Sequence, residues 1–199
     1  YPAWAKGALI YQIFVDRFFS SKRRGRVNRS WEELPDRASI YGGDFDGIVE
    51  KLDYIRGLGA EVIYLCPVFR SQTNHKYDIE DYYAIDEMFG GEEALLRLVN
   101  AVHAAGMRLI LDCVFNHMSS NNAIFRDVVE RGENSRYKDW FYIYSYPVDP
   151  QKGNYDTFAG CVPSMPRMNT SNPEVIEYLV GSAVFWTKKL GIDGWRLDV

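Results

Sequence analysis

Four short apolar segments alternate along the chain with three segments of helical periodicity. The apolar segments predict β-strands, and the first two are continuous enough to be buried on both faces of a sheet. The helical segments place an apolar residue at every third or fourth position and end at a glycine. The predicted strands are 8–15, 61–66, 107–115 and 194–199, and the predicted helices are 44–59, 92–105 and 172–190. This alternation predicts parallel βα units with right-handed crossovers.

The helices differ in the signals that define them. The stripe of the first consists of Ile48, Leu52, Ile55 and Leu58, and the stripe of the second consists of Leu95, Leu98, Val99 and Val102. The third begins at Asn172 and Pro173, since asparagine caps helices and proline fits the first turn.

Two segments interrupt the alternation. Residues 118–171 are rich in Tyr, Asn, Pro and Ser, have no long amphipathic stripe, and predict a small lobe inserted after the third strand. The chain therefore divides into 1–117 with strands one to three, the lobe 118–171, and 172–199 with the third helix and the fourth strand. Residues 20–41 carry a basic cluster, which predicts a solvated loop, with a polyanion site as the alternative. The cluster consists of Lys22, Arg23, Arg24 and Arg26.

Two α/β architectures host such a series, an open doubly wound sheet and a (β/α)8 barrel. The open sheet usually binds a nucleotide through a glycine-rich turn after its first strand. Here Asp16-Arg17-Phe18-Phe19 follows that strand, and Gly42-Gly43-Asp44 lacks the spacing of a phosphate loop. A barrel needs about 250 residues, so we predict the first half of a TIM barrel with the remainder outside this sequence. Both chain ends look cut.

Composition excludes several classes of function. With 47% hydrophobic and 25% charged residues the chain is globular, and its net charge of −4 argues against a nucleic-acid coat. No apolar stretch approaches the length of a membrane span. Three cysteines without a CxxC pair and three histidines without an HxH or HExxH pattern argue against a disulfide framework and a zinc site.

Polar side chains follow the carboxyl ends of successive predicted strands. They are Asp16-Arg17, residues 74–78, Asp112 with Asn116-His117, and Arg196 with Asp198. In a parallel barrel these ends share the face that carries the active site. Ionised groups within apolar strands need partners or a function, which singles out Asp112, Arg196 and Asp198.

Strand alternation relates these three side chains. Arg196 and Asp198 project to the same side, and a guanidinium beside a carboxylate favours the ionised acid that a nucleophile requires. A purely structural ion pair is the alternative. Asp112 and His117 have opposite parity, so they share a site only if the third strand ends before His117.

Several motifs identify a family. LDCVFNH at 111–117 and DGWRLDV at 193–199 resemble the first two signature regions of the α-amylase superfamily of glycoside hydrolases. Five further segments resemble its cyclomaltodextrinase, neopullulanase and maltogenic-amylase branch, and they occur in the right order over nearly the whole chain. They are 11–18, 41–47, 74–86, 136–141 and 165–175.

The resemblance implies a (β/α)8 barrel with a lobe after strand three, acting with retention on α-1,4 or α-1,6 glucosidic bonds. It also implies roles for six residues. Asp198 is the nucleophile, Arg196 orients it, Tyr77 stacks under the sugar, His117 hydrogen-bonds the sugar, and Asp112 braces Arg196. Asn116 holds the strand-three loop or, in many relatives, a calcium ion. Retention needs a second carboxyl group, which the family supplies from strand five. Because no upstream glutamate is placed to replace it, we expect the 199 residues alone to be inactive.

The resemblance also sets expectations for ligands. We expect an α-glucan oligosaccharide or cyclodextrin as partner, with no nucleic acid, no membrane, no required cofactor and no metal site. Some relatives bind calcium in an acidic loop after strand one, but here residues 20–28 are basic, which argues against calcium. Branch members often dimerise through an extra N-terminal domain, so a homodimer is expected, and the lack of a signal-type segment predicts a cytoplasmic protein.

Two other functions stay open on sequence grounds. A non-catalytic carbohydrate-binding or accessory relative would keep the barrel and lose the catalytic acids. A nucleotide-binding α/β domain is the second, and the missing phosphate loop argues against it.

Overall fold

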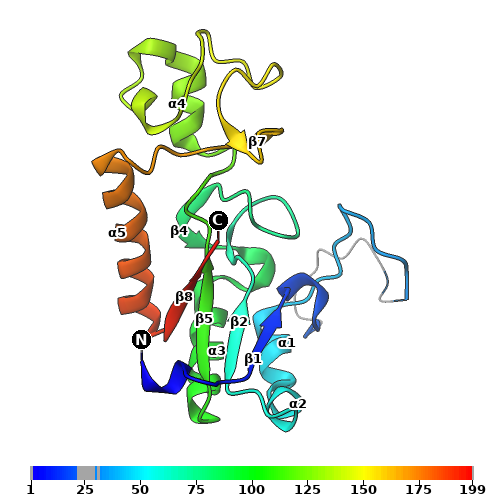
Figure 1. The fold of residues 1–199 in the computed structure, drawn as a ribbon. Helices are drawn as coiled ribbons and strands as arrows, with labels where there is room; N and C mark the ends of the chain where they lie inside the picture. Colours follow the sequence, from blue (N-terminus) through cyan, green and yellow to red (C-terminus); the bar gives the residue numbers. More distant parts are fainter. Residues whose placement is uncertain (1, 22–29, 31, 199) are drawn as a thin grey trace.

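The centre of the structure is a four-stranded parallel sheet. A computed structural model describes residues 2–21, 30 and 32–198. The strand order is β1-β2-β5-β8, and all three pairings are parallel (Figure 1). The strands are β1 Ile10–Ile13, β2 Val62–Leu65, β5 Arg108–Cys113 and β8 Gly194–Leu197. The four predicted strands and their parallel direction are confirmed, and each is shorter than its apolar segment.

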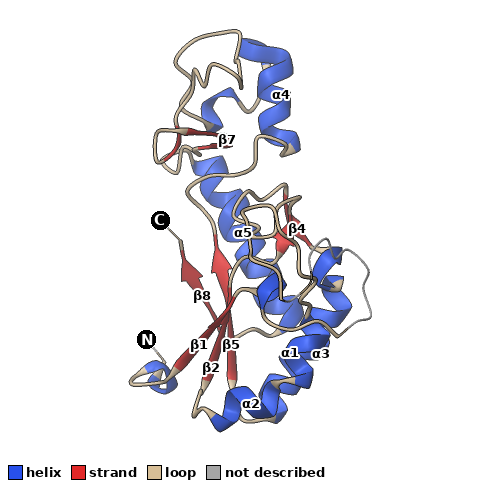
Figure 2. Ribbon diagram, turned by 90° about the vertical axis from the view of Figure 1, so that its right-hand side faces the viewer, coloured by secondary structure: helices blue, strands red, loops and turns tan. Residues whose placement is uncertain are grey.

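The helices that connect these strands lie on one side of the sheet. They are α1 Phe45–Glu50, α2 Leu52–Gly57, α3 Gly91–Ala104 and α5 Pro173–Leu190. Figure 2 shows α1, α3 and α5 on the same side of the strands. A doubly wound sheet carries helices on both faces and reverses its strand order, whereas here the spatial order follows the chain order. This is the arrangement of a singly wound α/β sheet, with its helices on one face.

The two longer helices form where the sequence predicts them. In α3 the predicted stripe of Leu95, Leu98, Val99 and Val102 is fully buried. The Asn172 side chain accepts a hydrogen bond from the Glu174 N–H and so caps α5. Gly191 ends α5 with a φ of 71°, a conformation that glycine adopts without strain.

The first predicted helix is two short helices instead of one. Lys51, with φ −105° and ψ 9°, separates α1 from α2. Ile48 and Ile55 of the predicted stripe are buried, but Leu58 lies beyond the end of α2 and is 48% exposed. The continuous helix 44–59 was wrong because hydrophobic spacing does not register a single non-helical residue.

The first strand is not buried on both faces as predicted. Ile10 is 52% exposed, whereas Ile13 is buried. At the opposite side of the sheet Leu197 of β8 is 72% exposed. Each of these outer strands has one neighbouring strand in the sheet, so the apolar sequence alone overstates how much of it is covered.

The loops between these strands and helices contain shorter elements. The segment after β2 contains an antiparallel pair, β3 Phe69–Arg70 and β4 Asp81–Ile85. The inserted segment contains α4 Ala123–Arg131 and a second pair, β6 Thr157–Phe158 and β7 Val162–Pro166. Short 3-10 helices are η1 Ala3–Ala5, η2 Val15–Arg17, η3 Glu87–Phe89, η4 Gly132–Asn134 and η5 Lys138–Trp140. The sequence did not predict the amphipathic helix α4, whose nine residues bury Phe125 and Val128, because so short a stripe repeats only twice.

The inserted segment stands beyond the carboxyl ends of the strands (Figure 1). Its two ends are hydrogen-bonded to each other where they leave the sheet. The Met118 N–H donates to the Pro166 carbonyl at 3.2 Å, and the Met168 N–H donates to the Asn116 carbonyl at 2.9 Å. Within the segment, the Ser120 N–H donates to the Ser164 carbonyl at 2.8 Å. The neck of the insertion is therefore a short paired ribbon.

The Gly42-Gly43-Asp44 segment is built against the end of β1. The buried Asp16 carboxylate accepts hydrogen bonds from the N–H groups of Tyr41 and Gly42. A Cβ at Gly43 would lie 2.0 Å from the Val15 carbonyl oxygen, so only glycine fits this close approach.

The predicted basic cluster at 22–26 lies outside the described residues. In the part of the chain that is described, no helix is both long and apolar enough to cross a membrane.

Candidate active site

A buried carboxylate at the carboxyl edge of the sheet organises a polar cluster. Asp112, near the end of β5, is fully buried. It accepts hydrogen bonds from the Tyr64 hydroxyl on β2 and, at 3.1 Å, from the Tyr77 hydroxyl in the loop after β2. The parallel register pairs Asp112 with Arg196 of β8, and the Arg196 Nη1 lies 3.3 Å from the Asp112 Oδ1. Three strands thus meet at one carboxylate.

Arg196 joins this buried carboxylate to a second one. Its Nη1 also donates to the Asp198 Oδ1 at 2.5 Å. The backbone N–H of Asp198 donates to the Cys113 carbonyl at 3.0 Å and continues the sheet. Trp195 points to the other face, where its Nε1 donates to the Thr187 Oγ1 on α5. Arg196 and Asp198 therefore project together, as strand alternation predicts.

The two carboxylates differ in their surroundings. Burial raises the pKa of Asp112, and the hydrogen bond from Tyr64 and the Arg196 charge oppose that rise. The hydrogen bond to Asp198 raises the pKa of Arg196, so the guanidinium stays charged. Among the described residues, no partner binds the Oδ2 of Asp198. Asp112 is thus a bracing group, and Asp198 keeps one oxygen available for a ligand.

The two tyrosines act as hydrogen-bond donors to Asp112. Burial, followed by the interaction with Asp112, raises the pKa of Tyr64 and the pKa of Tyr77. Both hydroxyls therefore stay protonated and donate to the carboxylate. The sequence did not point to Tyr64, although a hydroxyl within a buried strand needs a partner, and that was the signal that could have found it.

Two histidines are connected through the backbone of Tyr77. The Tyr77 N–H donates to the His75 Nδ1 at 3.0 Å, and the His117 Nε2 lies 3.1 Å from the Tyr77 carbonyl oxygen. A carbonyl only accepts, so the His117 Nε2 carries the proton, whereas the His75 Nδ1 carries none. Burial lowers the pKa of both histidines, which keeps them neutral.

His117 is set back from the cluster. Its side chain is 1% exposed and packs 4.8 Å from the Phe158 ring of the inserted segment. Its Nδ1 lies 3.3 Å from the Nδ2 of Asn116. Because β5 ends at Cys113, the opposite parity of Asp112 and His117 does not keep them apart. The structure thus links Tyr77, Asp112, Arg196 and Asp198 in a chain of hydrogen bonds, with His117 bound to the Tyr77 carbonyl and Asn116 bound to His117.

Asp16 and Arg17 are not part of this cluster. The Arg17 side chain donates to Asp16 and to the Asp36 and Ser39 carbonyls, so this pair holds the loop that precedes α1. The Asp44 carboxylate accepts from the Gly47 N–H and the Ser21 hydroxyl, which is the arrangement of a helix cap.

Within the described residues, no group of three His, Cys, Asp or Glu side chains is placed to hold a metal ion. Residues 22–29 lie outside those described, so the argument against calcium stays a prediction.

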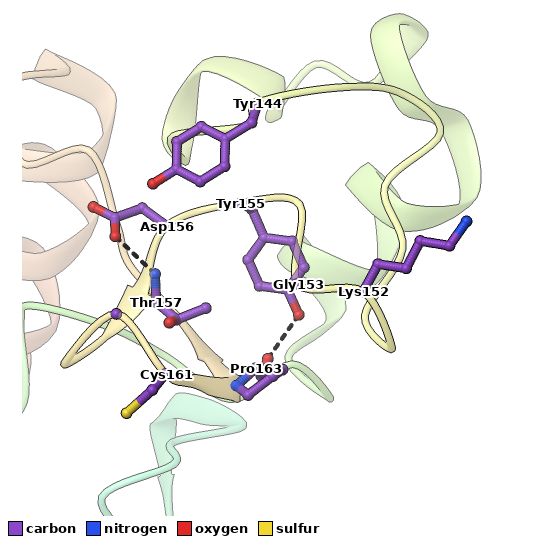
Figure 3. A pocket seen from close by; sticks show the side chains of 9 residues that line it. Tyr144, Lys152, Gly153, Tyr155, Asp156, Thr157, Cys161 and Pro163 are labelled. Atoms are coloured by element: carbon purple, nitrogen blue, oxygen red, sulfur yellow. Dashed lines mark hydrogen bonds between the residues drawn. The ribbon is translucent and has the colours of Figure 1, made fainter.

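A cavity of about 270 Å³ lies in the inserted segment (Figure 3). The Tyr155 hydroxyl at its wall donates to the Pro163 carbonyl at 2.7 Å, and the Asp156 side chain accepts from the Thr157 N–H at 2.9 Å. Its lining residues are Tyr144, Lys152, Gly153, Tyr155, Asp156, Thr157, Gly160, Cys161 and Pro163. None of these contributes to the Asp112 cluster, so the cavity is separate from the candidate active site.

The neutral histidines predict a pH dependence of stability. Because their pKa values are lowered below 6.5 in the folded state, the unfolded state binds more protons as the pH falls below 6.5. The contribution of the two histidines to the free energy of unfolding should therefore be complete above pH 6.5, and the free energy of unfolding should decrease below that pH. Urea denaturation of the full-length protein at pH 7.5 and pH 5.5 measures this. His117→Gln, which keeps an N–H donor, should show a smaller decrease, and an equal decrease in both proteins would contradict the prediction.

Comparison with known proteins gives a consistent set of matches. The family model described as alpha amylase, catalytic domain, matches residues 12–199. Neopullulanase 2 of Thermoactinomyces vulgaris is 48% identical over all of this chain, and the intracellular maltogenic amylase of Bacillus subtilis (strain 168) is 47% identical. This chain covers 34% of each of these relatives, so it spans about a third of the length of the curated relatives that it matches.

Solved structures resemble the whole chain. The ligand-free cyclic alpha-maltosyl-(1→6)-maltose hydrolase of Arthrobacter globiformis superimposes with a TM-score of 0.93 at 39% identity, covering 100% of this chain and 45% of that one. A cyclomaltodextrinase superimposes with a TM-score of 0.91 at 44% identity, covering 100% of this chain and 35% of that one.

Proposed function

The chain belongs to the α-amylase catalytic-domain family, and on that premise we propose that the full-length protein is a retaining hydrolase or transglycosylase of α-glucans. In this proposal the chain supplies the nucleophile, Asp198. The observation that carries it is the placement of Asp198 at the carboxyl edge of the sheet, with Oδ1 bound to Arg196 at 2.5 Å and Oδ2 available to a ligand.

The chemistry proceeds in two displacements. The Asp198 carboxylate attacks the anomeric carbon, the glycosidic C–O bond breaks, and the leaving oxygen takes a proton from a general acid. Water, or a sugar hydroxyl in transglycosylation, then releases the glycosyl group from Asp198 and returns that proton. Arg196 orients Asp198 through the hydrogen bond to its Oδ1, and Asp112 holds Arg196 in place. Tyr77 offers its ring to the sugar, and His117 hydrogen-bonds a sugar hydroxyl through its Nδ1, in exchange for the Asn116 amide that lies 3.3 Å away.

The general acid must come from elsewhere in the full-length protein. Retaining enzymes place it about 5–5.5 Å from the nucleophile. Among the described residues, the second carboxyl group that contacts Arg196, besides Asp198, is Asp112. It is buried and its oxygens accept hydrogen bonds from two tyrosines and from Arg196, so it is not placed to protonate a leaving group. We propose that the sheet is the first half of a (β/α)8 barrel with a lobe after strand three, and that the second half supplies the acid.

The names of the relatives suggest the substrates. They include a neopullulanase, a maltogenic amylase, a cyclomaltodextrinase and a hydrolase of a cyclic maltosyl-maltose. We therefore propose maltooligosaccharides and cyclodextrins, with α-1,4 and α-1,6 linkages, and no required cofactor. By the same resemblance we propose a cytoplasmic homodimer.

Assays of the full-length protein and of the 199 residues alone test the proposal. The full-length protein should hydrolyse a chromogenic maltoside and β-cyclodextrin, and should release products that retain the α configuration by NMR. The 199-residue chain should give no turnover, since it lacks the acid. Cyclodextrin binding without turnover by the full-length protein would favour the non-catalytic alternative, and turnover by the 199 residues would refute the placement of the acid.

A further inference from the structure

Lys76 is a buried lysine in an unusual backbone conformation. Its side chain is 0% exposed, and its φ is 61°. Lysine is almost never fully buried without a partner, and a side chain at positive φ is disfavoured where glycine would adopt the same conformation freely. Two unfavourable features thus coincide at one residue, which indicates that the side chain has a task at this position.

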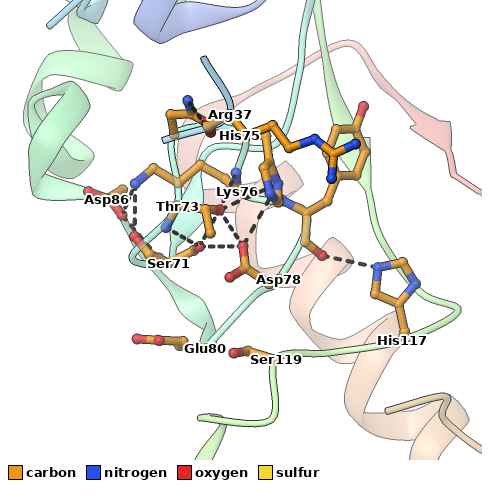
Figure 4. A network of polar contacts seen from close by, with 12 residues as sticks. Arg37, Ser71, Thr73, His75, Lys76, Asp78, Glu80, Asp86, His117 and Ser119 are labelled. Carbon is orange, nitrogen blue, oxygen red and sulfur yellow. Dashed lines mark hydrogen bonds and ion pairs between the residues drawn. The ribbon is translucent and has the colours of Figure 1, made fainter. Parts of the chain in front are cut away.

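The ammonium group ties the turn after β3 to the end of β4. The Lys76 Nζ lies 2.8 Å from the Asp86 Oδ2 and 2.8 Å from the Ser71 carbonyl oxygen (Figure 4). The sulfur of Met88 at 3.7 Å and the ring of Phe89 at 5.2 Å complete its surroundings. All of these groups come from the loop that joins β2 to α3, so the ion pair closes this loop on itself.

Asp86 is also fully engaged. Its Oδ2 accepts from the Ser71 N–H at 3.0 Å, and its Oδ1 accepts from the Met88 N–H at 2.8 Å. The same carboxylate therefore fixes the start of the turn and the start of η3. With Lys76 bridging from Ser71 to Asp86, the positions of residues 71–76 relative to β4 are set by one buried ion pair.

The turn held in this way delivers Tyr77 to the candidate active site. Three atoms of Tyr77 make specific bonds there: the hydroxyl to Asp112 at 3.1 Å, the N–H to the His75 Nδ1 at 3.0 Å, and the carbonyl to the His117 Nε2 at 3.1 Å. A rotation of the backbone at Lys76 would move all three together, because Lys76 directly precedes Tyr77.

We propose that Lys76 is a positioning residue: its buried ion pair with Asp86 fixes the Tyr77 ring and, through the Tyr77 backbone, the tautomers of His75 and His117. The catalytic consequence rests on the proposed function, in which Tyr77 carries the sugar ring. Lys76 itself does not reach Asp112 or Asp198. Its action is transmitted through the chain to its neighbour, so its effect on catalysis should depend on Tyr77.

Lys76→Gly distinguishes the role of the side chain from that of the backbone, since glycine keeps φ near 61° without strain while the buried side chain and its ammonium are lost. In the full-length protein, kcat/KM on the chromogenic maltoside should fall about 100-fold, as expected for a misplaced binding group. In a Tyr77→Ala background the same change should lower kcat/KM less than about threefold, because contacting residues are not additive. Lys152→Gly, at an exposed loop lysine, should leave kcat/KM unchanged.

Nitrogen-15 NMR of labelled histidines reads the positioning without substrate. In the wild type, the His75 Nδ1 and the His117 Nδ1 should be unprotonated with a single tautomer each, whereas Lys76→Gly should give mixed tautomers for both. If Lys76→Gly does not fold, Lys76→Arg, which places a larger guanidinium against Met88 and Phe89 in the same buried space, should show the same changes in part. Unchanged tautomers, or equal losses of rate in both backgrounds, would overturn the proposal. If the wild type does not turn over the maltoside but Lys76→Gly still gives mixed tautomers, the proposed function is refuted and the positioning role of Lys76 stands.

Discussion

Asp198→Asn should lower kcat of the full-length protein on maltosides and cyclodextrins by about 10⁴-fold or more, because the amide that replaces the carboxylate is not a nucleophile. The thermal midpoint should change little, since the Asn oxygen still accepts from the Arg196 Nη1, which now holds the Asp198 Oδ1 at 2.5 Å. Steady-state rates and calorimetry on the same preparations measure the two quantities. A wild-type rate in this variant would remove Asp198 from the nucleophile role.

Asp193→Asn is the matched control for this variant. Asp193 stands at the other end of the same strand, where it accepts from the Leu109 N–H at 2.9 Å and pairs with His103 at 2.7 Å. Its substitution should weaken stability and leave kcat unchanged.

Asp198→Gly supplemented with azide gives a further check, because azide can then attack the anomeric carbon and release a glycosyl azide of inverted configuration.

Arg196→Met should lower kcat/KM about 1,000-fold, in the range seen when a preorganised electrostatic group is removed from an active site. Without the guanidinium, the carboxylates of Asp112 and Asp198 face each other with no cation between them. The Arg196 charge opposes the rise that burial causes in the pKa of Asp112, so its loss should raise that pKa further, and the acid limb of the pH–rate profile should move to higher pH. An unshifted acid limb with the same loss of rate would show that Arg196 only orients Asp198.

The parts of the fold that depend on local signals could be predicted from the sequence. The capping Asn172 and the stripe ending at Val102 define α5 and α3 because a helix is specified by residues within a few turns of one another. The break at Lys51 and the exposure of Ile10 could not be predicted in this way. The exposure of Ile10 depends on what lies across the sheet, and the break at Lys51 depends on the backbone conformation of one residue. Hydrophobic spacing contains neither kind of information.

The candidate site shows the same limit. Arg196 and Asp198 could be paired from strand alternation, since their relation is local to one strand. Tyr64 was missed because a tyrosine between Ile63 and Leu65 has the pattern of ordinary core, and its partner Asp112 is 48 residues away. Lys76 was missed because a lysine in a polar loop is usually solvated, and only the folded loop brings it to Asp86.

The paired neck of the inserted segment has a consequence for how this protein can be altered. Because the chain leaves and returns through adjacent hydrogen-bonded residues, the gap that the insertion bridges is the same whatever its length. A lobe exchanged at Met118 and Pro166 should therefore leave β5 in place, provided that it keeps the Trp140 contact with Glu174 of α5 and the Phe158 contact with His117. The neck is thus a grafting point at which the inserted segment can be redesigned while the hydrogen bonds of the Asp112 cluster are kept.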